Sequence, residues 1–144
     1  MSASKRDVRT QFAAICYRVL RDKPEVLLIS SRRSRRWIIP KGWPMDGKTP
    51  TECAMAEAWE EAGVIGRVHP RCLGLFSYLK EMDEGETNLP CVAMVYAVRV
   101  KSLAKDYPEA NERQRRWFRP NRAAERVDEP ELAHLLQKFD PSLL

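Results

Sequence analysis

The stretch GWPMDGKTPTECAMAEAWEEAGV, from Gly42 to Val64, decides how the rest of the chain is interpreted. Glu57, Glu60 and Glu61 are spaced by three and four residues, so a helix would place them on one face. Carboxylates at this spacing repel one another, and those in the last turn also meet the negative end of the helix dipole. A hard divalent cation, Mg²⁺ or Mn²⁺, would turn this repulsion into shared coordination. The alternative is a solvated acidic face.

Local signals predict a helix over about residues 50–62. Thr49 suits the N-cap, Pro50 suits the first helical position, and Glu52 completes a Thr-x-x-Glu capping box. Gly63 suits a left-handed residue that ends the helix. The residues on the arc opposite the three glutamates are predicted to pack, and they are Met55, Ala58, Trp59 and Ala62.

The same stretch resembles the signature of the Nudix hydrolases, G-x5-E-x7-R-E-U-x-E-E-x-G-U, in which U is a bulky aliphatic residue. Laid on this chain without gaps, the signature matches at Gly42, Glu57, Glu60, Glu61, Gly63 and Val64. The resemblance implies that Glu57, Glu60 and Glu61 are catalytic metal ligands. It also implies that the backbone carbonyl of Lys41 or Gly42 is a further ligand.

The chain departs from the signature at three positions. The first glutamate of the signature falls on Lys48, its arginine on Ala56, and its first U on Ala58. In the family, that glutamate and that arginine are read as residues that orient the metal-binding carboxylates. Our hypothesis is that Lys48 supplies the missing positive charge to Glu61 or to the substrate. The alternative is that Lys48 is a surface lysine in a loop.

Segments outside the signature resemble one branch of the family, the diphosphoinositol polyphosphate phosphohydrolases. These segments are Ser30-Ser31-Arg32, Arg36-Trp37-Ile38-Ile39-Pro40-Lys41-Gly42 and Arg115-Arg116-Trp117-Phe118. The likeness covers roughly residues 9–122. It departs after Pro40, where Lys41-Gly42-Trp43 replaces a more glycine-rich run. The resemblance implies a substrate rich in phosphate.

Charge points to a phosphate-rich substrate independently of the family. The formal net charge is +5, with 17 arginines against 8 lysines, and the planar arginine fork binds phosphate oxygens in pairs. The run SSRRSRRW at 30–37 is the densest part and is predicted to be a loop between two strands. It is interpreted as a polyanion pocket, a solvated loop or a nucleic-acid patch, and the pocket is favoured because the run leads directly to Lys41 and Gly42. The predicted substrate-binding residues are Arg18, Ser31, Arg32, Arg36, Lys41, Lys48 and Arg115.

The chain is long enough for one domain, predicted over residues 9–144 after a flexible segment at 1–8. Its four cysteines lack C-x-x-C spacing, and no hydrophobic leader precedes them, so we expect free thiols in the cytoplasm. No apolar run is long enough to span a membrane. Nucleic-acid binding is disfavoured because no zinc-finger spacing or recognition helix is recognisable. The sequence carries no signal for oligomeric state.

The order of elements predicts an α/β fold. Strands are expected at about residues 11–20, 26–31, 37–39, 66–69, 72–80, 90–100 and 116–118. Helices are expected at about 50–62 and 131–138, with a short one near 120–125. This order suits a mixed β-sheet between helices, which is also the α/β/α sandwich that the Nudix resemblance implies.

We therefore predict a metal-dependent pyrophosphohydrolase acting on a small polyphosphorylated substrate. A diphosphoinositol polyphosphate or a dinucleoside polyphosphate is favoured. The alternatives are a nucleoside triphosphate pyrophosphatase and a non-catalytic module that binds phosphate ligands. Glu84 or Glu86, in the acidic stretch KEMDEGETN at 80–88, is a candidate for one more metal-binding carboxylate.

Overall fold

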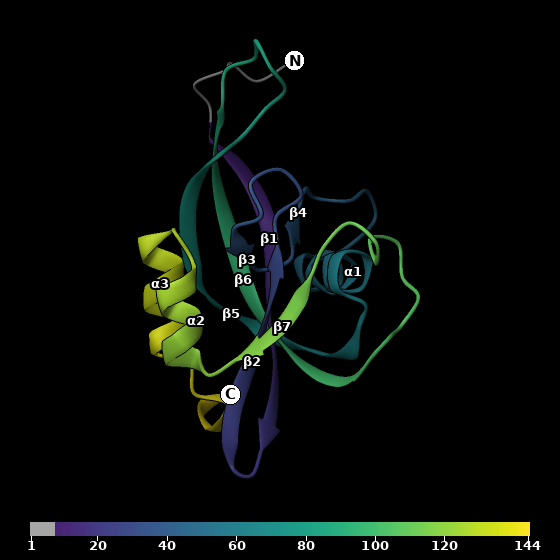
Figure 1. Cartoon of the computed structure of the whole chain (residues 1–144), viewed down its shortest axis with the longest axis vertical. Coiled ribbons are helices and arrows are strands. Elements are labelled where there is room, and N and C mark those ends of the chain that lie inside the picture. The colour runs from purple at the N-terminus through teal and green to yellow at the C-terminus, as the bar shows by residue number, and fades with distance from the viewer. Residues whose placement is uncertain (1–7) are drawn as a thin grey trace.

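Strand β1 (Arg9–Leu20) organises the fold, because the central part of this strand is buried on both faces. The computed structural model describes residues 8–144 and shows helices on either side of one sheet (Figure 1). Helix α1 (Pro50–Ala62) covers one face, while α2 (Pro120–Arg126) and α3 (Pro130–Gln137) cover the other. Side chains of a strand alternate between the two faces, so Ala13, Ile15 and Tyr17 join the α2 and α3 side. Their neighbours on the α1 side are Phe12, Ala14 and Cys16.

The sheet is mixed and has seven strands. Besides β1 it contains β2 (Lys23–Ser30), β3 (Trp37–Ile38), β4 (Lys41–Gly42), β5 (Val64–Lys80), β6 (Leu89–Leu103) and β7 (Arg115–Phe118). The main order is β3-β2-β1-β6-β5, with β4 paired to β1 and β7 paired to β2. Strands β1 and β6 run parallel, and every other pairing is antiparallel. A short 3₁₀ helix, Pro141–Leu143, follows α3.

The predicted α/β fold is confirmed, with differences in two strands. The strands expected at 66–69 and 72–80 are one strand, β5, whose register shifts between Val68 and Cys72. Strand β4 was not predicted, because its two residues are extended only through pairing with Phe12 and Ala13 of β1. Except for Val8, the segment predicted to be flexible lies outside the described residues. Among residues 8–144, the helices all lack the length and apolar character of a membrane span.

Helix α1 begins and ends where its local sequence predicts. The Thr49 hydroxyl accepts a hydrogen bond from the Glu52 backbone at 3.3 Å, and the Thr49 backbone donates to the Glu52 carboxylate at 2.8 Å. Gly63 ends the helix with φ at 66° and ψ at 28°, a left-handed conformation. These caps fix the start and the end of the helix that bears the glutamates.

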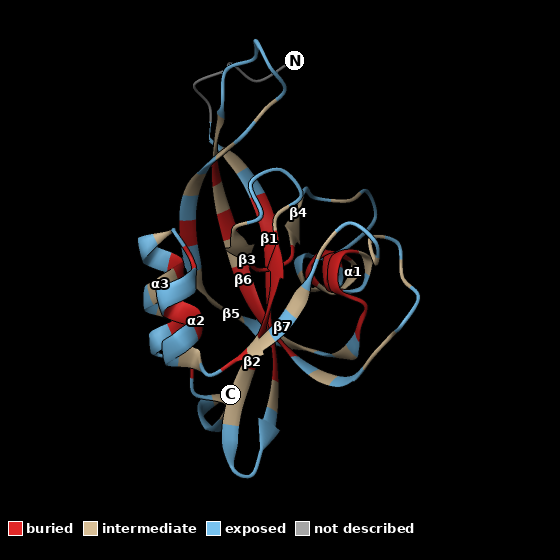
Figure 2. Cartoon of the chain, in the orientation of Figure 1, coloured by how far each residue is buried: buried red, intermediate tan, exposed pale blue. Residues whose placement is uncertain are grey.

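The predicted orientation of α1 is wrong in part. Trp59 is 39% exposed, although its position opposite the glutamates had indicated packing. The helix instead packs through small residues, and Glu57 and Glu61 are buried beside them, at 7% and 6% exposure. Small side chains let the helix approach the sheet closely, which draws the two carboxyl groups inside. Figure 2 shows the buried residues gathered in the central strands and in α1.

We expect Gly63→Ala to lower the free energy of unfolding by about 1–2 kcal/mol or more, because a left-handed residue with a Cβ is strained. A Cβ at Gly63 would also collide with the side chains of Tyr107 and Arg115. Gly85→Ala is the matched control, since φ is 86° there but the space around it is open. Denaturant unfolding of both variants measures the difference. If the two variants lose the same free energy of unfolding, the contacts of Gly63 with Tyr107 and Arg115 do not contribute to the effect.

Candidate active site

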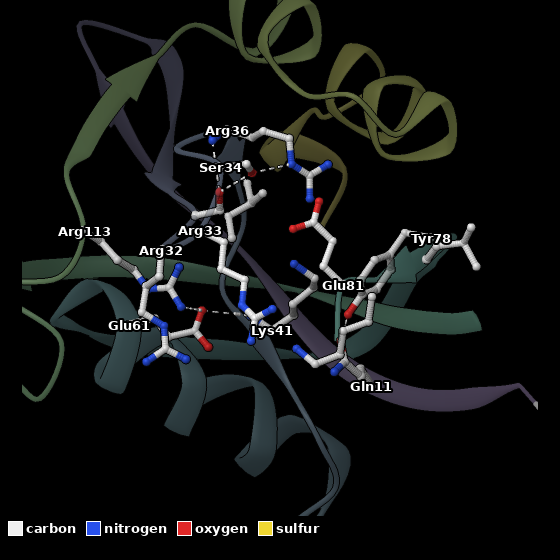
Figure 3. Close-up of a pocket in the computed structure, with 14 residues that line it drawn as sticks. Gln11, Arg32, Arg33, Ser34, Arg36, Lys41, Glu61, Tyr78, Glu81 and Arg113 are labelled. Atoms are coloured by element: carbon white, nitrogen blue, oxygen red, sulfur yellow. Dashed lines mark hydrogen bonds and ion pairs between the residues drawn. The ribbon is translucent and has the colours of Figure 1, made fainter. Parts of the chain in front are cut away.

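A polar pocket of about 170 Å³ opens beside the C-terminal part of α1. The β2–β3 loop, β4, the end of β5 and the residue Arg113 surround it, as Figure 3 shows. Its lining is Gln11, Ser31, Arg32, Arg33, Ser34, Arg36, Ile38, Lys41, Glu61, Tyr78, Leu79, Lys80, Glu81 and Arg113. The predicted loop at 31–36 therefore lies at the same place as one of the predicted glutamates.

Glu57 and Glu61 form a pair of carboxyl groups one helical turn apart. Each is buried, and the proximity of Glu61 helps to raise the pKa of Glu57. The backbone N–H of Lys41 lies 3.4 Å from Oε1 of Glu61, and Nη2 of Arg113 lies 3.8 Å from the same oxygen. Strand β4 and Arg113 thus both approach the same oxygen of Glu61.

Burial makes the ionised forms of this pair costly. It raises the pKa of Glu57 to about 9, with further contributions from the hydrogen bond to Glu61 and from the charges of Glu61 and Glu60. Burial also raises the pKa of Glu61, although the hydrogen bond to Glu57 and the charge of Arg113 act in the opposite direction. At neutral pH and without a cation, the pair therefore retains a proton.

The residues present fit a divalent cation. Two buried carboxyl groups side by side are hard oxygen donors, and a cation would replace the proton they share. Gly42 leaves room for this pair, because a Cβ at that position would collide with the Glu57 carboxylate. Glu60 is half-buried, its charge acts to raise the pKa of Glu57, and its backbone carbonyl accepts a hydrogen bond of 3.0 Å from Glu109. Within residues 8–144, no three His, Cys, Asp or Glu side chains are already grouped for metal binding.

The cationic side of the pocket comes mainly from the β2–β3 loop. Arg32 forms an ion pair with Glu112 at 3.2 Å, and Arg33 pairs with Asp83 at 2.5 Å. Arg36 lies 3.4 Å from Asp128 and 3.5 Å from Glu129. The loop is held in shape by the Ser31 hydroxyl, which accepts a hydrogen bond of 3.0 Å from the backbone of Arg36. The structure therefore brings Ser31, Arg32 and Arg36 together in the pocket lining, and their contact with a substrate stays a prediction.

Lys41 also lines the pocket. Its ammonium nitrogen lies 4.8 Å from the centre of the Tyr78 ring. Burial lowers the pKa of Lys41 to about 8, although the charge of Glu61 acts to raise it. A phosphate placed in the pocket would favour the charged form of this lysine.

Three other predicted residues do not reach the pocket. Arg18 is seven residues along β1 from Gln11, a distance of about 23 Å for an extended strand, and it pairs with Glu25 at 2.7 Å. Arg115 donates hydrogen bonds of 2.8 Å to the carbonyls of Ala62 and Ala104, so it anchors the end of α1.

The third of these residues is Lys48. It is exposed before the first turn of α1, and the helix separates it from Glu61 by about 16 Å. Lys48 is therefore too far away to compensate the charge of Glu61, and its exposure is what the surface-lysine alternative predicted. A contact between Lys48 and the substrate, the other part of the hypothesis, stays a prediction.

The acidic loop contributes a different residue from those predicted. Glu84 and Glu86 are exposed and lie outside the pocket lining, whereas Glu81 is part of it. Sequence reasoning missed Glu109, whose charge acts to raise the pKa of both Glu57 and Glu61. It also missed Gln11 and Arg113. None of these three lies in a local motif, and only the tertiary fold brings them to the site.

Comparison with known proteins identifies the family of this chain. A family model described as NUDIX domain matches residues 9–139. The chain belongs to the Nudix family, and the resemblance inferred from the sequence is confirmed.

Individual relatives add detail. The chain is 32% identical over 120 residues to Nudix hydrolase 12, mitochondrial, of Arabidopsis thaliana, covering 82% of this chain and 59% of that protein. It is 32% identical over 109 residues to the human diphosphoinositol polyphosphate phosphohydrolase 3-beta, covering 74% of this chain and 62% of that protein. The chain thus spans about three fifths of the length of these relatives. The crystal structure of a C. elegans Ap4A hydrolase superposes with a TM-score of 0.68 at 22% identity, covering 96% of this chain and 100% of that one, and confirms the fold.

We expect the stability of the metal-free protein to fall as pH rises, and Glu57→Gln to reduce that fall. A carboxyl group whose pKa is raised from 4.5 to about 9 stabilises the fold at low pH, and this contribution is lost as pH rises through that interval. Glutamine cannot ionise, so the variant should be the more stable protein at pH 8.5 in EDTA. Thermal unfolding at pH 6 and pH 8.5 measures the effect.

The control for this experiment is Glu52→Gln. Glu52 is exposed, and hydrogen bonds from Thr49 lower its pKa, so its titration lies below the interval tested. Parallel pH curves for Glu57→Gln and wild type would contradict the assigned environment of Glu57.

Proposed function

We propose that this chain is a metal-dependent pyrophosphohydrolase that cleaves a phosphoanhydride bond in a highly phosphorylated small molecule. The observation that supports this most directly is the buried Glu57–Glu61 pair at the edge of an arginine-rich pocket. Nudix hydrolases generally need divalent metal ions, and Mg²⁺ or Mn²⁺ suits carboxylate oxygens. The proposed ligands are Glu57, Glu60 and Glu61, together with a backbone carbonyl of Lys41 or Gly42.

In the proposed mechanism, the glutamates bind the metal ion and the basic residues of the pocket bind phosphate. A divalent ion, when bound, supplies positive charge that offsets the charge developing on the leaving phosphate and makes water more acidic. Glu57 and Glu61 hold that ion, and one of the glutamates accepts the proton of the attacking water. Arg32, Arg36 and Lys41 bind the phosphate oxygens that do not react. Ser31 keeps the loop in the conformation that presents Arg36.

The composition of the pocket favours a substrate with several phosphates over one recognised mainly through a base. Its hydrophobic members are Ile38, Tyr78 and Leu79, and the rest of the lining is polar or charged. A diphosphoinositol polyphosphate, the class for which the human relative is named, is therefore preferred. A dinucleoside polyphosphate, the class to which the Ap4A of the C. elegans hydrolase belongs, is also proposed.

Two alternative functions are compared with this proposal. A nucleoside triphosphate pyrophosphatase would use the same glutamates and fewer of the arginines. A binding module without turnover would have no use for two buried carboxyl groups that repel each other once ionised.

A cytoplasmic location stays a prediction, since the named relatives include mitochondrial ones. All four cysteines are free, as predicted.

Turnover should be observed with an inositol pyrophosphate, with Ap4A or with a nucleoside triphosphate when Mg²⁺ is present, and should be absent in EDTA. Phosphate or nucleotide release measures it for each compound in parallel. Glu61→Gln should reduce the rate by about 100-fold or more, because the ion contributes several kcal/mol of charge stabilisation. Hydrolysis that survives in EDTA, or in Glu61→Gln, would refute the proposed chemistry.

Replacing the pocket arginine Arg36 with methionine should raise KM by about tenfold or more, since a charged hydrogen bond contributes about 1.5–3 kcal/mol. Arg18→Met is the matched control, because Arg18 is also paired with a carboxylate but lies on a distant part of β1. Its KM should stay within about twofold of wild type. Equal effects of the two variants would show that overall charge, and not the pocket, binds the substrate.

A further inference from the structure

The departures from the Nudix signature leave the buried glutamates without the cation that the signature provides. Ala56 has no charge, and Lys48 lies at the opposite end of α1 from Glu61. A buried carboxylate that loses its cationic partner is strongly destabilised. Either the pair in this chain is unsupported, or a cation from elsewhere in the fold has taken that place.

We propose that Arg113 is a positioning residue that replaces the missing signature arginine and holds Glu61 for binding of the divalent ion. This inference rests on the proposed function only in assuming that the pair binds a metal ion. Arg113 belongs to the segment before β7, 52 residues after Glu61, so it lies outside any local motif.

The geometry of Arg113 is that of a fixed, buried guanidinium. Its side chain is 8% exposed. Nε donates a hydrogen bond of 2.8 Å to Glu109, and Nη1 donates one of 3.1 Å to the backbone carbonyl of Ser30. The remaining nitrogen, Nη2, faces Oε1 of Glu61 at 3.8 Å (Figure 3). Because the guanidinium is planar and its Nε and Nη1 are both hydrogen-bonded, the direction of Nη2 is fixed.

Neighbouring backbone bonds keep this arginine in place. Ser30 donates from its backbone to the Gln114 carbonyl at 3.0 Å, and the Gln114 backbone donates to the Ser30 hydroxyl at 2.8 Å. On the other side of the segment, the Glu109 backbone donates to the carbonyl of Glu60. The segment is therefore attached to β2 and to α1 at once, with Arg113 between the two attachments.

The contact leaves Glu61 able to bind an ion. At 3.8 Å the guanidinium attracts the carboxylate without a direct hydrogen bond, so the oxygens stay accessible to a cation. Among the basic side chains near Glu61, Arg113 is the one whose charge most lowers its pKa, ahead of Lys41. An arginine in this position counteracts part of the cost of burying Glu61.

The test compares Arg113→Met and Arg113→Lys with wild type by calorimetric titration of Mn²⁺ into the substrate-free protein. Loss of an outer-sphere partner typically weakens metal affinity by about 10–100-fold, and we expect a loss of that size for Arg113→Met. Arg113→Lys keeps the charge without the fork and should recover part of the affinity. With an active substrate, kcat should fall more than KM rises.

Arg115→Met is the matched control for loss of stability. Arg115 is also an arginine bonded to backbone carbonyls, but it contacts Ala62 and Ala104 and not Glu61. Thermal unfolding in EDTA measures how far each variant is destabilised. Arg115→Met should lose stability while its Mn²⁺ affinity stays within about threefold of wild type.

The outcomes separate this inference from the proposed function. Arg113→Met with Mn²⁺ affinity within about threefold of wild type would overturn the inference, as would equal losses in Arg113→Met and Arg115→Met. A wild type that binds no Mn²⁺ would overturn it as well. A wild type that binds Mn²⁺ but hydrolyses none of the compounds would refute only the proposed function, and the titration of Arg113→Met would still decide the inference.

Discussion

Two carboxyl groups, Glu57 and Glu61, lie side by side out of water, and much of the surrounding structure accommodates them. Small residues on α1 bring that helix close enough to the sheet to bury both groups. Gly42 provides the space that the Glu57 carboxylate occupies. Arg113 and the backbone of Lys41 provide positive and partly positive groups for Glu61. A helix optimised only for stability would carry apolar residues at both positions, and this cost is the reason why we propose that the pair binds a cation.

The part of this site that lies in one continuous segment could be predicted from the sequence. The start, end and caps of α1 depend on Thr49, Glu52 and Gly63, which act within one helical turn, so their signals are local. The same is true of the arginine-rich loop, because the apolar strands on both sides define its limits. The mixed sheet between helices could also be predicted, since the order of apolar segments and helices is characteristic of such folds.

Features that depend on distant segments could not be predicted in this way. Helical spacing alone could not show that Trp59 is exposed while Glu57 is buried, because rotation of a helix about its axis is set by what it packs against. Arg18 shares the charge of the loop arginines but lies too far along β1 to join them. Arg113 was missed because it lies in the segment between β6 and β7, which comes near Glu61 only in the folded chain. The helix that carries the three glutamates was therefore predictable, whereas the residue that compensates the charge of Glu61 was not.

Three of the four arginines of the β2–β3 loop already form ion pairs with acidic side chains, and these are Arg32, Arg33 and Arg36. A ligand that enters must compete with those carboxylates, so it exchanges one anionic partner for another. A single phosphate would gain little from such an exchange. A molecule with several closely spaced phosphates can displace several carboxylates at once. Such exchange would favour ligands of high charge density over ligands with a single phosphate.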